Sequence, residues 1–437
     1  MKRKIFYIFL FLFALFNYSI AGAINMEFKT IKLNNGATVK YLYRDNIPIV
    51  YLSVLIPASV LDEEKPSQAY LTAHLLTHGT KNLSAREIED KIDFFALSIE
   101  KKVHYDYTLL TLATTKRYLN EGLELFFEIL KNPTFPEEEF KKEVSILEKS
   151  LKQMEQDPSY IAHKHFLKKL FGEHPYGRPI EGEPEKLKDL TRQDILKFYE
   201  KFYKPNKMIF SFVGDIDEKE LKDKIEKYIL PWQGVIYDRQ IFPPVFQKRD
   251  KPLELKINRK DLTQSTIVLG FEGISRKDPD FFATSLMNYV LGGGGLTSRL
   301  TKKVREEKGL AYSIYSTFTP YLLNGAFYIE VKTKAENTDN VVKMITEELK
   351  NMVNNGLTEE ELREAKAFLV GSFPLRIDTM KKINEFLPII DFYQLGDDYI
   401  NRYAEYIEKV SIEDIKRVSE KIINYKNFIL IIAGPSN

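Results

Sequence analysis

Hydrophobic and polar residues alternate in patterns typical of strands and helices, and the same succession of these patterns occurs in both halves of the chain. In the first half, apolar runs typical of strands lie at 49–58, 104–115 and 208–214. Their counterparts in the second half lie at 265–273, 325–333 and 427–434. Stretches with apolar residues every three or four positions predict helices between them. Each half should therefore form an α+β domain, an antiparallel-rich sheet covered on one face by helices.

Two pairs of matching segments indicate that these halves are duplicated. Phe140 in TFPEEEFKKEV matches Leu362 in LTEEELREAKA, an offset of 222 residues. Ile195 in LTRQDILKFYE matches Ile415 in VSIEDIKRVSE, an offset of 220 residues. Collinear matches at nearly one offset are typical of a repeated domain rather than of chance similarity.

The segment between the halves, residues 231–252, carries four prolines and no helical period, so it predicts a linker. We therefore expect an N-terminal domain at 24–230 and a C-terminal domain at 253–437. Two similar domains on one linker suggest a hinged pair that face each other across a cleft.

The first 23 residues have the pattern of a secretory signal peptide. Lys2, Arg3 and Lys4 precede an apolar run over 5–16, and the small residues SIAGA follow. That run is short for a transmembrane helix, so we expect an exported protein, with the periplasm as its compartment and no stable membrane insertion after signal removal. A retained N-terminal anchor is the alternative.

The composition limits which partners and which reactive groups this protein can have. The formal charge of +2 falls to about −1 when the three basic residues of the signal are removed, which gives no reason to propose a nucleic-acid partner. The chain has no cysteine, so disulfides and thiolate chemistry are excluded. Any metal site must use His, Asp or Glu.

A histidine pair in AYLTAHLLTHGT (69–80) has the spacing of zinc ligands. His74 and His78 stand one helical turn apart on a predicted helix that runs into the Gly79–Thr80 turn. The simpler interpretation is that both are packed or hydrogen-bonded residues of an apolar helix.

Four further motifs give the chain a family resemblance: GTKNLSAREIEDKID (79–93), NPTFPEEEF (132–140), HPYGRPIEG (174–182) and LGGGGLTSRLTKKVREEKGLAYSIYS (291–316). With them it resembles the pitrilysin/insulinase family of zinc metallopeptidases, and in particular half-size members similar to the mitochondrial processing peptidase. In that family an H-x-x-E-H helix supplies two zinc ligands and a general base, and a later helix supplies a glutamate ligand.

The family pattern can be placed on this helix in two frames. Anchored on the Gly-Thr turn, it puts Tyr70 at the first ligand, Ala73 at the base and His74 at the second ligand. Anchored on HLLTH, it keeps His74 and His78 as ligands and puts Thr77 at the base. The first frame needs no gap and is preferred, and neither frame has a glutamate at the base position.

The third ligand position falls on Ser150 in the preferred frame. Glu148 lies two residues away, which turns it to roughly the opposite side of a helix. In the other frame Glu155 could be considered a ligand, although it sits differently relative to the following Asp157–Pro158. The resemblance therefore implies a degenerate zinc site, with no catalytic residue of its own and no metal in the isolated chain.

The second half keeps the motif VREEKGLAYSIYS. In the family, an arginine and a tyrosine of this motif reach the zinc site, hold the substrate backbone and stabilise the developing oxyanion. The matching positions are Arg305 and Tyr312. Without the resemblance, Arg305 would be read as a surface helix residue and Tyr312 as a strand residue of the core.

Some half-size family members pair a zinc-bearing subunit with a degenerate one that supplies this arginine and tyrosine. The resemblance therefore implies a non-catalytic subunit that binds peptide or unfolded protein and completes the active site of a zinc-bearing homologue. Two alternatives stay open: an active metallopeptidase that uses His74 and His78, and a peptide-binding scaffold without a hydrolytic partner.

Overall fold

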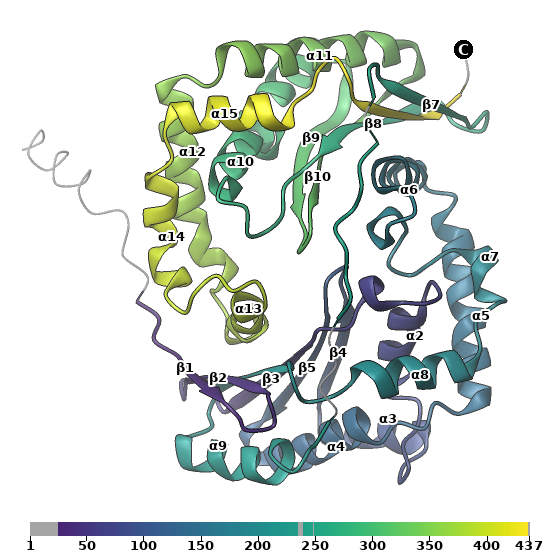
Figure 1. The fold of residues 1–437 in the computed structure, drawn as a ribbon, viewed down its shortest axis with the longest axis vertical. Coiled ribbons are helices and arrows are strands. Elements are labelled where there is room, and N and C mark those ends of the chain that lie inside the picture. The colour runs from purple at the N-terminus through teal and green to yellow at the C-terminus, as the bar shows by residue number, and fades with distance from the viewer. Residues whose placement is uncertain (1–24, 235–238, 248, 436–437) are drawn as a thin grey trace, which may run out of the picture.

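The computed structural model describes residues 25–234, 239–247 and 249–435, and the predicted signal peptide lies outside these ranges. Its strands form two sheets, one in each half of the chain (Figure 1). The first is six-stranded, in the order β1 (Lys29–Lys32), β2 (Thr38–Tyr43), β6 (Ile209–Gly214), β3 (Ile49–Ile56), β5 (Thr108–Thr115), β4 (Ser98–Val103). The second is five-stranded, in the order β7 (Leu253–Asn258), β11 (Ile429–Gly434), β8 (Gln264–Glu272), β10 (Gly325–Lys334), β9 (Ala311–Pro320).

Helices surround both sheets. The first half holds α2 (Gln68–Leu75), α3 (Ala85–Phe94), α4 (Leu119–Lys131), α5 (Glu137–Met154), α6 (Pro158–Phe171), α7 (Pro184–Leu187), α8 (Arg192–Phe202) and α9 (Glu218–Lys224). The second half holds α10 (Phe281–Asn288), α11 (Thr338–Asn355), α12 (Glu359–Ser372), α13 (Met380–Phe392), α14 (Tyr399–Glu408) and α15 (Ile412–Ile422). π-Helical turns occur at Ile225–Ile229, Tyr289–Gly293 and Thr301–Glu307.

The two sheets have the same topology, which confirms the α+β fold of two similar halves. Without β1, the order β2-β6-β3-β5-β4 repeats as β7-β11-β8-β10-β9. In both sheets the first pair of this order is parallel and the other pairs are antiparallel. The repeat extends to helix starts, because Thr191 with Asp194 and Ser411 with Asp414 form capping boxes at the starts of α8 and α15.

In each half, one helix packs on the sheet of the other half. α6 packs on β8 and β11 of the second sheet, and α13 packs on β3 and β6 of the first (Figure 1). His163 of α6 lies 2.6 Å from the Glu330 carboxylate of β10, which also accepts a hydrogen bond of 2.7 Å from the Tyr315 hydroxyl. On α13, the buried Asn384 amide donates to the Ser211 carbonyl over 2.6 Å. These polar contacts fix the position of each exchanged helix.

A buried carboxylate joins the halves at a second place. Asp106, in the β4–β5 connection, is 2% exposed and accepts three hydrogen bonds. The hydroxyls of Tyr176 and Tyr393 donate over 2.5 and 2.6 Å, and the backbone N–H of Leu322 donates over 2.9 Å. Tyr393 and Leu322 belong to the second half, so this one carboxylate ties together segments far apart in the sequence. Burial raises the pKa of Asp106, and the three donors oppose that shift.

The segment that joins the halves has little regular structure. Among the residues described between the π-helical turn at Ile225–Ile229 and β7, none lies in a helix or strand. The predicted domain boundaries at 230/231 and 252/253 stay a prediction. Within the described ranges, no helix is both long and apolar enough to cross a membrane.

Candidate functional site

The histidine pair lies where α2 ends. α2 is short and stops at Leu75, so His74 belongs to its last turn and His78 to the loop that follows. The Tyr70 ring stacks on the His74 ring with centroids 4.1 Å apart, as expected for residues one turn apart on one helix face. His78 Nδ1 lies 3.1 Å from the His74 carbonyl oxygen, so this nitrogen is a donor and Nε2 points elsewhere.

Both imidazoles face one carboxylate, Glu143 of α5. Its oxygens lie 3.9 Å from His74 Nδ1 and 3.8 Å from His78 Nε2, beyond the range of a hydrogen bond. Glu143 was not among the residues predicted from the sequence. The signal was present, because Glu143 precedes Ser150 by seven residues, nearly two full helical turns, and so shares its helix face.

A lysine also reaches this cluster. Lys101 of the edge strand β4 donates through Nζ to the Thr77 hydroxyl over 2.8 Å and to the His74 carbonyl over 3.1 Å. Burial lowers the pKa of His74 to about 4, helped by the positive charge of Lys101. His74 is therefore neutral at neutral pH and makes no ion pair with Glu143 despite their proximity. Burial also lowers the pKa of Lys101, whereas Glu143 acts in the opposite direction.

The remaining predicted positions are placed differently. Ala73 is fully buried, so the base position of the preferred frame is an apolar core residue. Ser150 is exposed on α5, and its assignment with Tyr70 and Ala73 as degenerate positions stays a prediction. Glu148 pairs with Lys152 on the exposed side of the helix. Glu155 is held by the Lys164 ammonium at 2.9 Å.

These donors do not fit the zinc ion that the family resemblance implies. In the described ranges, no group of three or more His, Asp or Glu side chains is arranged to hold a metal ion. In the preferred frame the base position is Ala73, whose side chain is a methyl group. The Lys101 ammonium lies next to the histidines, where it donates to the His74 carbonyl and the Thr77 hydroxyl. No chemical step through a metal is therefore derived for this chain.

The VREEKGLAY motif forms a helix end followed by a bulged edge strand. The π-helical turn at Thr301–Glu307 carries Arg305, and Gly309 ends it with a positive φ of 64° and an N–H that donates to the Arg305 carbonyl. In β9, Ala311 pairs with Thr333 and Ser313 with Lys332, which leaves Tyr312 as the extra residue of a β-bulge.

Both predicted residues of this motif are accessible. Arg305 is exposed, and Tyr312 keeps 54% of its surface accessible, so the alternative of a core tyrosine is wrong. A bulge re-aims a side chain away from the regular alternation of the strand, and it commonly occurs at functional sites. The structure places both residues in the second half, whereas the His74 cluster belongs to the first.

The HPYGRPIEG loop supports the start of the histidine helix. Arg178 donates to the buried Glu63 carboxylate over 2.8 Å, and Glu63 in turn accepts the Ala69 N–H of α2 over 2.8 Å. The Ser67 hydroxyl donates to the Glu181 carbonyl over 2.8 Å. The loop therefore fixes the first turn of α2.

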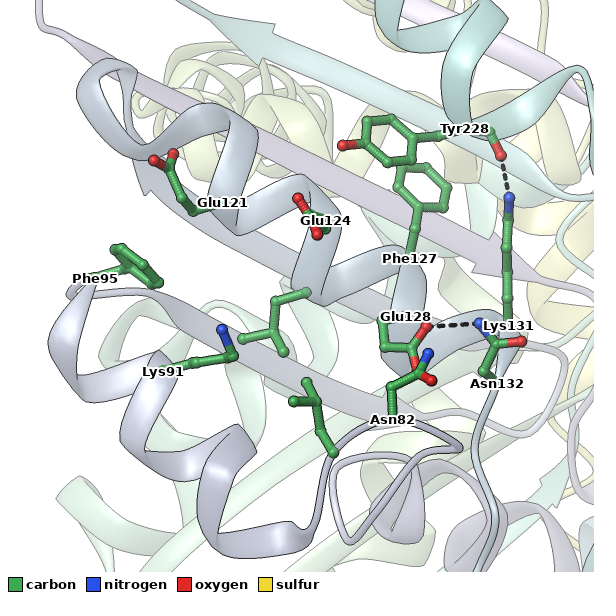
Figure 2. Close-up of a pocket in the computed structure, with 12 residues that line it drawn as sticks. Asn82, Lys91, Phe95, Glu121, Glu124, Phe127, Glu128, Lys131, Asn132 and Tyr228 are labelled. Atoms are coloured by element: carbon green, nitrogen blue, oxygen red, sulfur yellow. Dashed lines mark hydrogen bonds between the residues drawn. The ribbon is translucent and has the colours of Figure 1, made fainter.

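A groove of about 390 Å³ lies away from this cluster, between α3 and α4. Figure 2 shows Glu121, Glu124 and Glu128 along α4, opposite Lys91 of α3 and Phe95, the residue that follows this helix. Glu128 accepts a hydrogen bond of 2.6 Å from the Asn132 amide, and Lys131 donates to the Tyr228 carbonyl. None of the predicted site residues lines the groove, so it gives no support to a site there.

Both halves of the chain match models of one protein family. A model described as "Insulinase (Peptidase family M16)" matches residues 41–184. A model described as "Peptidase M16 inactive domain" matches residues 189–369. The two ranges nearly adjoin and belong to one peptidase family.

Individual proteins agree with this assignment. A Bacillus subtilis protein named as the uncharacterized zinc protease YmxG is 26% identical, over 84% of this chain and 88% of that protein. A Helicobacter pylori protein named non-peptidase homolog YmxG is 28% identical, over 87% and 88%. The crystal structure of a peptidase M16 inactive domain from Pseudomonas fluorescens superposes with a TM-score of 0.87 at 25% identity, over 94% of this chain and 98% of that one. The chain belongs to the pitrilysin/insulinase family, peptidase family M16, and is similar to its inactive-type members.

Proposed function

We propose that this chain is an exported, non-catalytic subunit that binds peptide or unfolded protein and completes the active site of a zinc-bearing homologous partner. The observation that carries the proposal is the contrast between the halves. The first half has lost the groups that activate water, and the second half keeps an accessible arginine and tyrosine.

The first half supports the non-catalytic role through the chemistry that is missing. Zinc-dependent hydrolysis of a peptide needs a bound metal to acidify water and a carboxylate to take its proton. Ala73 stands at the base position in the preferred frame, and Thr77 stands there in the other. Neither side chain can act as a general base at neutral pH.

The second half supports a role in binding and transition-state stabilisation. A guanidinium and a phenol placed beside a peptide carbonyl donate hydrogen bonds that strengthen as negative charge develops on the oxygen. Arg305 and Tyr312 are both exposed and are free to face a substrate or a partner subunit. The π-helical turn and the bulge that carry them are backbone features common at functional sites.

The compartment and the partner belong to the same proposal. The pattern of residues 1–23 supports export to the periplasm, and zinc would reside in the partner subunit. A search of the neighbouring genes for a homologue with an intact H-x-x-E-H motif tests the pairing at little cost.

The direct test uses the mature chain alone and mixed with such a homologue. The chain alone should contain no stoichiometric zinc and cleave no unfolded peptide, and the mixture should cleave faster than the homologue alone. Arg305→Ala should lower kcat of the mixture by about 100-fold, the usual cost of one transition-state donor, and Tyr312→Phe should lower it by about 10-fold or more. Lys302→Ala, an exposed change on the same helical turn, is the matched control.

Two outcomes would replace this proposal. Stoichiometric zinc and peptidase activity in the lone chain, both lost in His74→Ala, would establish the alternative of an active enzyme that uses His74 and His78. Peptide binding that no homologue converts into cleavage would establish the scaffold alternative.

A further inference from the structure

We infer that Lys101 is a resident cation that takes the place of a metal ion in the degenerate site and keeps divalent cations out of it. The inference rests on the proposed non-catalytic function and gives it a specific physical cause. Without Lys101, the remaining donors of the cluster would be two imidazoles and a carboxylate.

The first observation is the convergence of groups that could otherwise bind a cation. Glu143 faces His74 Nδ1 and His78 Nε2 at 3.9 and 3.8 Å. Two imidazole nitrogens and one carboxylate are the donor types of a catalytic zinc site, although their present spacing does not form one. Because His78 Nδ1 lies against the His74 carbonyl, Nε2 is the ring nitrogen that faces Glu143.

The second observation is the way Lys101 enters this group. β4 is the edge strand of its sheet and contacts α2, so its side chains reach the end of that helix without crossing another strand. Both contacts of Nζ are oxygen acceptors, the Thr77 hydroxyl and the His74 carbonyl, as an ammonium donor requires.

Charge explains why a metal ion and Lys101 exclude each other. Glu143 is partly buried, with 14% of its side chain exposed, and a carboxylate with little access to water needs a nearby positive charge. The Lys101 ammonium, held by the Thr77 hydroxyl and the His74 carbonyl, supplies a positive charge to the same cluster. A divalent cation beside the histidines would instead be repelled by the ammonium at low effective dielectric.

Lys101→Met tests the inference, because methionine keeps the length and the apolar stem of lysine and removes the charge. Zinc binding is measured by calorimetry on the mature chain, with zinc chloride as the probe. The wild type should show no saturable site, whereas Lys101→Met should bind one zinc ion at least about 100-fold more tightly than the wild type. The gain should disappear in Lys101→Met combined with Glu143→Gln or with His78→Ala.

The matched control is Lys142→Met, which removes one exposed positive charge next to Glu143 on α5 and should leave zinc binding unchanged. Circular dichroism of each variant checks that it is folded. A folded Lys101→Met that binds zinc no better than Lys142→Met would overturn the inference and leave the proposed function intact. A wild-type chain that binds one zinc ion through His74 and hydrolyses peptide would overturn both.

Discussion

Replacing Asp106 with alanine measures how firmly the two halves are held together. The change leaves the buried hydroxyls of Tyr176 and Tyr393 and the N–H of Leu322 without their acceptor. Each buried polar group left unpaired costs about 1–3 kcal/mol, so the free energy of unfolding should fall by roughly 3–5 kcal/mol, allowing for partial solvation of Leu322. Tyr393→Phe removes one hydrogen bond to a charged group and should cost about 1.5–3 kcal/mol.

Two probes in urea unfolding separate stability from coupling of the halves. Trp232, the single tryptophan, packs against the core of the first half, so its fluorescence reports that half, whereas far-UV circular dichroism reports both. The two transitions should coincide in the wild type and diverge in Asp106→Ala. Asp90→Ala, an exposed change on α3, should stay within about 0.5 kcal/mol of the wild type. A loss below about 1 kcal/mol in Asp106→Ala, with coincident transitions, would refute the role assigned to this carboxylate.

Three further predictions concern the site and its supports. Because the pKa of His74 falls from 6.5 in the unfolded chain to about 4 in the fold, only the unfolded state gains this proton between those pH values. Stability should therefore fall as the pH drops from 6.5 to 4, by at most about 3 kcal/mol from this group, and urea unfolding of His74→Gln at pH 7 and pH 4.5 should show a smaller loss than the wild type. Gly182→Ala should cost about 2–4 kcal/mol, since its φ is +94° and a Cβ would lie 1.9 Å from Ser67 Oγ. Gly371→Ala, at an open position in the last turn of α12, should instead gain up to about 0.5–1 kcal/mol in the same assay. Tyr312→Phe should leave the free energy of unfolding within about 0.5 kcal/mol of the wild type, because its side chain is exposed; a larger change would mean that the residue is structural.

The sequence revealed the central strands better than the edges of the sheets. β3, β6 and β11 are buried along most of their length, so their apolar runs stand out. β4, with the sequence SIEKKV, is an edge strand whose polar residues hide the alternation. For β9 the sequence placed Tyr312 in a strand but wrongly in the core, because the bulge at Tyr312 breaks the period of two.

The exchange of α6 and α13 could not be predicted for a different reason. The spacing of apolar residues identifies the buried face of a helix but not the sheet that covers it, which depends on contacts between distant parts of the chain. The same limit applies to the site. Glu143 could have been found from its helix face, whereas nothing local to Lys101 indicates that it reaches His74.

The exchanged helices also set the order in which this chain can fold during synthesis. The first sheet has its strands complete by residue 214, yet the helix that packs on β3 and β6 ends only at Phe392. Until then, the nascent chain exposes a sheet face that its own half does not cover, with Leu55, Ile209 and Val213 among its apolar residues, and exposed apolar surface promotes aggregation and chaperone binding. Contacts over this sequence separation also make folding slow. The native state is therefore reached only after almost the whole chain has been made.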